Sequence, residues 1–166
     1  MGPPGHFGIA FAAKTLAPQA PLWTFLVASE ALDLLSFGFE ALGLEKFAAS
    51  ESDFVKGVQI LVPGSVPYSH GLVMSLVWSI LFSTVAFIFF RDRRISMILG
   101  LVVFSHWILD FIVHPPDLPI FLEGSPLLGL GLWTSGPGLI ASGILEFVLL
   151  AGGLIFYLIY RKRRKA

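Results

Sequence analysis

The stretch SHWILDFIVHPPDLP, residues 105–119, sets three titratable side chains at helical spacing inside an otherwise apolar run. His106, Asp110 and His114 lie at i, i+4 and i+8, so on a helix they follow one slowly turning stripe. Two prolines come next, and a residue before proline is disfavoured in the helical conformation. The sequence therefore predicts a helix that ends near His114 and leaves Asp117 free to turn back toward the same stripe.

The composition around this stretch is that of an integral membrane protein. Apolar residues make up 55% of the 166 residues and charged residues 13%, against roughly 25% charged residues in soluble domains. The length suits a single domain. Cysteine is absent, which excludes disulfides and thiolate metal sites. Eleven basic residues balance eleven acidic ones, so no overall charge favours nucleic acid as a partner.

Four apolar segments reach the roughly 20 residues that a transmembrane helix needs. A shorter one, residues 5–17, has about half that length and is predicted to be a half-helix that is re-entrant or packed among the others. Ser69 is a candidate N-cap for one of the spans. The prediction is an all-α integral membrane protein, a compact bundle of one N-terminal half-helix and four transmembrane helices at about 21–44, 69–90, 95–114 and 137–160.

The connections between these segments indicate an orientation. Most basic residues gather in RDRR at 91–94 and in the tail at 161–166, and the positive-inside rule makes that side cytoplasmic. The C-terminus is then expected in the cytoplasm, and the segments 45–67 and 115–136 are expected as outer loops. The first of these loops carries the charged residues Glu51, Asp53 and Lys56.

Polar residues from several segments fall at one depth in this topology. At about 1.5 Å per helical residue, all four histidines and three acids lie in the middle to outer half of the membrane. A buried ionisable group is costly in lipid, so such residues are expected to face the interior of the bundle. The residues in this layer are His6, Asp33, His70, His106, Asp110, His114 and Glu146.

This layer has the chemistry of a metal site. His106 and Asp110 can both reach one cation, as paired ligands on a helix do. Nitrogen and carboxylate ligands suit Zn²⁺ or Mn²⁺, as one ion or as two bridged by a carboxylate. The predicted ligands are His6, Asp33, His70, His106 and Asp110. His114 and Asp117 are candidate catalytic residues at the mouth, as a general base or as the donor to a leaving group.

Each of these residues also has a simpler interpretation. A single histidine in a span more often bonds a neighbouring helix than a metal. Glu146 is equally well explained as a protonated donor between helices, and whether Glu30 and Glu146 belong to the site stays open. Glu40 is more simply an interface charge. The RKRRK tail is best explained as an anchor at an anionic lipid surface.

Four short motifs resemble a known family, the small bacterial inner-membrane proteins described as membrane-bound metal-dependent hydrolases, some of which carry the label LexA-binding. The motifs contain His6 in GHFGIA, Asp33 in EALDLLSF, His70 in YSHGLVMS, and His106 with Asp110 in FSHWILDF. The resemblance implies the bacterial inner membrane as the location. The order of the motifs is also similar to that of soluble zinc-dependent phospholipase C enzymes, which implies a phosphoester substrate.

Three functional hypotheses follow. The first is a metal-dependent hydrolase that acts on a lipid or phosphoester in the outer half of the membrane, with the segment 115–136 as a lid. The second is a metal-ion or proton carrier, which predicts a second polar cluster toward the cytoplasmic side. The third is a structural or partner-binding protein, whose polar residues are inter-helix hydrogen bonds worth about 0.6–2 kcal/mol each.

Overall fold

The structure, a computed structural model, describes residues 1–48, 54–55, 58–59, 62–122 and 124–164. Helices dominate it, as the sequence predicted. A short 3-10 helix, η2, covers Leu132–Thr134. The α-helices of the described part are α1 Pro3–Leu16, α2 Leu22–Ser29, α3 Ala31–Ala41, α4 Leu72–Phe90, α5 Arg93–Val113 and α6 Gly136–Arg163.

The fold is all-helical with little sheet, and the two segments predicted as outer loops contain short antiparallel strand pairs. Pairing satisfies backbone groups that an apolar, turn-rich segment would otherwise leave unbonded. Glu51, Asp53, Lys56 and the last two residues of the tail lie outside the described residues. The pairs are β1 Lys46–Ala48 with β4 Val62–Ser65, β2 Phe54–Val55 with β3 Val58–Gln59, and β5 Leu118–Pro119 with β6 Leu127–Leu128.

Three helices, α4, α5 and α6, are long and apolar enough to cross a membrane. The span predicted at 21–44 is not one straight helix, because α2 and α3 meet at an angle of 55°. Glu30 lies at the break with φ −105° and ψ 8°, and its N–H bonds the carbonyl of Val27 three residues back. The helical hydrogen-bond ladder is therefore interrupted at Glu30. The described part holds three candidate spans, or four if the bent pair is counted as one.

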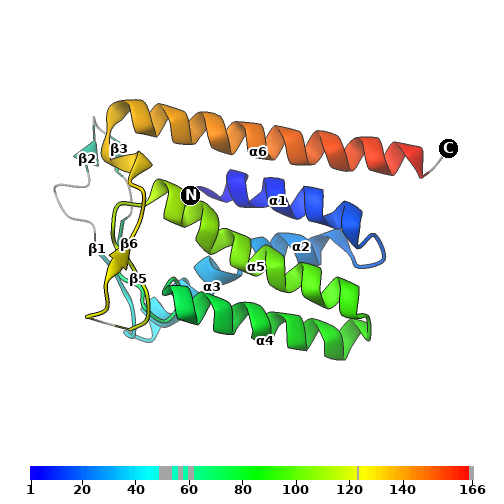
Figure 1. Cartoon of the computed structure of the whole chain (residues 1–166), viewed down its shortest axis with the longest axis horizontal. Helices are drawn as coiled ribbons and strands as arrows, with labels where there is room; N and C mark the ends of the chain where they lie inside the picture. Colours follow the sequence, from blue (N-terminus) through cyan, green and yellow to red (C-terminus); the bar gives the residue numbers. More distant parts are fainter. Residues whose placement is uncertain (49–53, 56–57, 60–61, 123, 165–166) are drawn as a thin grey trace.

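The helix α5 is the centre of the bundle. It packs against α1, α2, α3 and α4, while α6 packs against α1. Its buried side chains include Leu99, Val103 and Trp107, which join Phe25 and Leu32 in the main apolar core. Figure 1 shows the α1–α2 turn, the α4–α5 connection and the C-terminal end of α6 at one end of the molecule, with the strand pairs at the other. The basic residues of 91–94 and of the tail therefore share one end, as the predicted parity requires.

The half-helix α1 is held against α6 by a close contact between backbones. An ideal Cβ on Gly153 would lie 2.0 Å from the carbonyl oxygen of Gly8, and one on Gly8 would lie 2.3 Å from that of Leu149. Only glycine allows this approach. Near the other end of α1, the Lys14 ammonium donates to the carbonyls of Pro18 and Ala20 in the turn that follows. This packing fixes the height of His6 in the bundle.

The predicted N-cap of α4 is wrong. Ser69 does not cap α4, since the N-cap residue is Gly71 and no side chain caps it. The hydroxyl of Ser69 bonds other groups, as described below. Asp92 and Ser135 do act as caps, because their side chains accept from the N–H of Ile95 and of Gly138.

Candidate metal centre

The five predicted metal ligands converge on one buried place in the half of the bundle nearer the strand pairs. His6 comes from α1, Asp33 from α3, His70 from the turn before α4, and His106 and Asp110 from α5. Two overlapping groups, His6–His106–Asp110 and Asp33–His70–His106, each have ligand atoms within 4.8 Å of one another. Buried His and Asp groups that could hold a metal ion are therefore present.

Four of these side chains bring their ligand atoms close together. His106 Nε2 lies 3.1 Å from Asp110 Oδ2 and 3.4 Å from Asp33 Oδ1. His70 Nε2 lies 3.5 Å and 3.3 Å from the same two oxygens. Bonds of about 2.0–2.2 Å to zinc place the ligand atoms of a tetrahedral site about 3.3–3.6 Å apart. These four nitrogen–oxygen separations suit ligands of one cation, and each group whose ligand atoms all lie within 4.8 Å of one another contains three of the residues.

The second ring nitrogen of His106 decides which tautomer faces this space. His106 Nδ1 lies 2.7 Å from the backbone carbonyl of Ser29. A carbonyl only accepts, so Nδ1 carries the proton and donates it. Nε2 is then left with its lone pair on the side of Asp33 and Asp110. A hydrogen bond of this kind behind the ligating nitrogen is usual for metal-bound histidines.

A chain of hydrogen bonds determines the tautomer of His70 in the same way. Ser69 Oγ lies 2.7 Å from Glu45 Oε2 and 2.8 Å from His70 Nδ1. The hydroxyl gives its one proton to the carboxylate, so His70 Nδ1 donates to Oγ and Nε2 keeps its lone pair. Glu45 is itself buried and accepts from the N–H groups of Tyr68 and Ser69, both at 2.8 Å, and from the Ser36 hydroxyl at 3.0 Å.

Two imidazole lone pairs and two carboxylates in an apolar interior suit a cation between them, beside the Met1 nitrogen that pairs with Asp110. His70, His106 and Asp110 are each at most 2% exposed. Among the described residues, His106 Nε2 and His6 Nδ1 are buried side-chain nitrogens without a hydrogen-bond partner. An unpartnered buried polar atom calls for a bound group. A divalent cation between Asp33, His70, His106 and Asp110 would give His106 Nε2 a partner and would offset the charge of the carboxylates.

His6 lies beside the tetrahedral set rather than within it. Its ring stacks on that of His106, with centroids 3.8 Å apart and planes 5° apart. Its Nε2 is 3.6 Å from Asp110 Oδ1 and 3.2 Å from the Met1 carbonyl, and the Met1 nitrogen pairs with the same Asp110 oxygen. Asp110 therefore uses one oxygen toward α1 and the other toward His70 and His106.

A cavity of about 540 Å³ leads to the cluster. Asp33, His70 and Asp110 lie in its wall, so the predicted ligands are reached from it. Its remaining wall combines acidic and apolar side chains, namely Met1, Pro3, Phe7, Glu30, Leu34, Phe37, Glu40, His114 and Trp133. An apolar molecule with a polar head fits a cavity of this kind.

The two residues predicted as catalytic form a pair at this cavity. His114 lines it, and His114 Nδ1 lies 3.2 Å from Asp117 Oδ1. Since a carboxylate accepts, Nδ1 donates and Nε2 of His114 is the basic nitrogen. Asp117, which pairs with His114, is not among the residues that line the cavity. Trp133 packs on the His114 ring at 4.7 Å between centroids.

Glu45 was not predicted to take part in the site, and the prediction of Ser69 as a helix cap was wrong. Glu45 was included only in an outer loop, and its burial depends on the fold of the segment around it. Glu30 and Glu40 both line the cavity, and Glu30 Oε1 is buried without a partner among the described residues. Glu146 lies outside both candidate ligand groups and accepts from the N–H of Gly2 at 2.9 Å.

Removing the Ser69 hydroxyl is expected to weaken metal binding. In Ser69→Ala, His70 Nδ1 loses its acceptor, so the ring is free to rotate or change tautomer. Loss of such an outer partner typically lowers metal affinity about 10- to 100-fold. Zinc titration of the purified protein against a competing chelator measures this change.

Ser105→Ala is the matched control for that variant. Ser105 also precedes a cluster histidine, but its hydroxyl donates to the Val102 carbonyl at 2.7 Å. Zinc affinity should therefore stay at the wild-type value. Equal affinity losses in Ser69→Ala and Ser105→Ala would contradict the role given to Ser69.

In comparisons with known proteins, no family model, no curated protein and no solved structure matches the chain.

Proposed function

We propose that this protein is a membrane-embedded metal-dependent hydrolase with a single Zn²⁺ held by Asp33, His70, His106 and Asp110. The observation that carries the proposal is the spacing of 3.1–3.5 Å between two histidine nitrogens and two carboxylate oxygens. Imidazole nitrogen together with carboxylate oxygen is a ligand set that zinc takes, whereas calcium and magnesium prefer oxygen ligands alone. His6 shields the set on the side of α1, where it stacks on His106.

The proposed reaction uses both the zinc ion and the His114–Asp117 pair at the cavity. A bound zinc ion polarises a carbonyl or phosphoryl oxygen and lowers the pKa of its water ligand toward 7. His114 is placed to move a proton, because its Nδ1–H is occupied by Asp117 and its other nitrogen is basic. Asp117 holds the ring in that tautomer, as the carboxylate of a catalytic triad does.

The cavity supports a lipid as the substrate. Phe7, Leu34, Phe37 and Trp133 supply an apolar wall suited to acyl chains, next to the polar cluster. Leu34 and Phe37 are 55% and 59% exposed, so this wall opens to the surroundings of the bundle. The resemblance of the motifs to zinc-dependent phospholipase C adds a phosphoester as the bond to be cleaved.

The arrangement supports the carrier hypothesis less well. A carrier needs polar groups on both sides of the cluster. Toward the basic end of the bundle, the buried side chains of the described residues are apolar apart from hydroxyls such as those of Thr15, Ser79 and Ser96, and no buried acid or histidine lies among them. The apolar side chains include Ala10, Ala13, Phe25, Leu99, Val102 and Val103. A purely structural role is also less well supported, because inter-helix hydrogen bonds would leave fewer orphaned atoms than His6 and His106 show.

The test combines metal content with turnover of a lipid. Wild-type protein in detergent should contain about one zinc per chain by elemental analysis and should hydrolyse mixed phospholipids in micelles. His114→Ala should keep the zinc and lower turnover about 10²- to 10⁴-fold, the usual range for a positioned acid or base. Protein that binds neither zinc nor manganese would refute the proposal, as would full turnover in His114→Ala.

We also propose that the protein lies in a bacterial inner membrane with the basic end in the cytoplasm, as the positive-inside rule favours. The chain lacks cysteine, so single substitutions give clean labelling sites. In inverted versus right-side-out vesicles, Ser125→Cys should react with an impermeant maleimide only from the outer side and Lys162→Cys only from the inner side. The reverse pattern would overturn the orientation and leave the metal site unaffected.

A further inference from the structure

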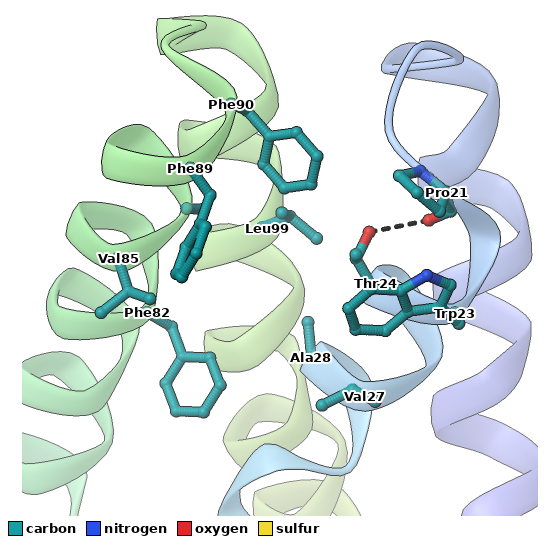
Figure 2. Close-up of a pocket in the computed structure, with 11 residues that line it drawn as sticks. Pro21, Trp23, Thr24, Val27, Ala28, Phe82, Val85, Phe89, Phe90 and Leu99 are labelled. Atoms are coloured by element: carbon teal, nitrogen blue, oxygen red, sulfur yellow. Dashed lines mark hydrogen bonds between the residues drawn. The ribbon is translucent and has the colours of Figure 1, made fainter.

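A second cavity lies at the other end of the bundle, away from the metal centre. It has a volume of about 480 Å³ and is lined by side chains of α2, α4 and α5 and by Pro21. Figure 2 shows its two walls, with Phe82, Val85 and Phe89 on one side and Thr24 and Val27 on the other. Leu99 lies between them.

This cavity is a groove that opens sideways into the hydrocarbon of the membrane. Two of its side chains, Trp23 and Phe89, are 64% and 79% exposed. Ala28 and Ala86 are small and buried, which leaves depth between the walls. The hydroxyl of Thr24 donates to the Pro21 carbonyl at 2.7 Å, so this lining residue offers no free donor to water. An empty groove here would forfeit dispersion contacts, which favours an apolar occupant.

The length of the groove matches one leaflet. From Phe82 to Phe90 the helix α4 rises roughly 12 Å, and half of the hydrocarbon core of a bilayer is about 15 Å. A lipid acyl chain that lies along the groove therefore has its headgroup at the end of α4. That end is formed by Phe90 and by the residues that follow it.

The headgroup end of the groove is strongly basic. Arg91 follows Phe90 directly and turns the chain in a left-handed conformation, with φ 53°. Arg91, Arg93 and Arg94 are all exposed, and the salt bridges found among the described residues include none of them. The one acid between them, Asp92, accepts from the N–H of Ile95 as a helix cap. Three cations without an acidic partner suit a phosphate.

We infer that the groove between α2 and α4 binds an anionic phospholipid, with an acyl chain on Phe82, Val85 and Leu99 and the phosphate at Arg91 and Arg94. This site is separate from the metal centre, and its occupant is a bound lipid and not a substrate. Charge complementarity selects an anionic headgroup over a zwitterionic one, because each basic residue near a membrane surface favours anionic lipid by about 1 kcal/mol, or about fivefold.

Quenching of Trp23 fluorescence by brominated lipids tests the inference on the full chain. The protein is reconstituted with increasing fractions of phosphatidylglycerol or phosphatidylcholine, each brominated in the acyl chain. The Trp23→Phe variant gives the signal of the other tryptophans, which is subtracted. Half-maximal quenching of Trp23 should need at least about fivefold less phosphatidylglycerol than phosphatidylcholine.

Two kinds of variant separate the headgroup from the acyl chain. The double variant Arg91→Gln with Arg94→Gln should remove the preference for phosphatidylglycerol. The double variant Arg161→Gln with Arg163→Gln, which changes the same charge on α6, should retain it. Val27→Phe adds a ring to the groove wall and should abolish the preference by filling the space, and Val77→Phe, on an exposed part of α4 outside the groove, should not.

Equal quenching by the two lipids in the wild type would overturn the inference, since it indicates only the ordinary lipid shell. An unchanged preference in Val27→Phe would also overturn it. A dimer that protects Trp23 from both lipids would show that a second copy covers the groove, and the lipid site would then be wrong.

Discussion

Asp110→Asn is expected to abolish metal binding while leaving the bundle folded. The Asp110 carboxylate is the one group that approaches all three cluster histidines, at 3.6 Å for His6, 3.5 Å for His70 and 3.1 Å for His106. The amide has the same shape but carries no charge, so the cation loses a ligand and half of its counter-charge. Loss of an outer partner already costs about 10- to 100-fold in affinity, and loss of this ligand is expected to exceed that range.

Two measurements on Asp110→Asn separate metal loss from misfolding. Elemental analysis should find about one zinc per wild-type chain and almost none in the variant. Zinc at 100 times its dissociation constant should raise the free energy of unfolding of the wild type by about 2.7 kcal/mol, and that of the variant by nothing. Compared with metal-free wild type, the metal-free variant should unfold at a lower midpoint, because the Met1 nitrogen loses its carboxylate partner.

Glu40→Gln is the matched control. Glu40 is an exposed acid in the wall of the same cavity, and it belongs to neither candidate ligand group. Zinc content and the zinc-dependent stabilisation should both remain at wild-type values. A zinc-replete Asp110→Asn protein would contradict the ligand set, and loss of zinc in both variants would point to the charge of the cavity as a whole.

Gly153→Ala is expected to destabilise the protein by forcing α1 and α6 apart. The added Cβ would lie 2.0 Å from the carbonyl oxygen of Gly8, so the backbones of α1 and α6 must move apart. Overpacking of this kind costs about 1–3 kcal/mol. The shift also moves His6, which stacks on His106, and zinc affinity should fall with stability. Denaturant unfolding in detergent micelles measures the first effect.

Gly152→Ala, one residue earlier in the same helix, is the control, and it is expected to stabilise the protein. An ideal Cβ on Gly152 meets nothing within 4 Å. Replacing a helical glycine by alanine at an open position stabilises by about 0.5–1 kcal/mol. If both variants were equally destabilised, the close contact between Gly8 and Gly153 would not be what holds α1 in place.

The sequence was enough to predict which residues approach one another, because two simple rules act on them. Helical periodicity put His106 and Asp110 on one stripe, and the cost of ionisable groups in lipid turned His6, Asp33 and His70 toward the same interior. Depth along each span then decided which polar groups could meet. The helices α4, α5 and α6 follow their predicted ranges closely for the same reason, since long apolar runs have few alternatives.

The sequence was not enough where local geometry depends on tertiary contacts. No proline or glycine lies at the bend near Glu30, so the sequence does not predict that bend. Serine is a residue type that often caps helices, but the Ser69 hydroxyl donates its hydrogen bond to Glu45, which is far from it in the chain. Glu45 is buried because the N–H groups of Tyr68 and Ser69 surround it, and no periodicity encodes such a contact.

The packing of α1 on α6 also determines when during synthesis α1 is secured. Residues 17–135 separate the two helices, so α1 is made long before its partner. Until α6 arrives, α1 lacks the surface that Gly8 fits, and only its contacts with α2 and α5 hold it in place. The four proposed zinc ligands are all made before α6, so the ion can load first, and the arrival of α6 then secures the helix that carries His6 against the finished site.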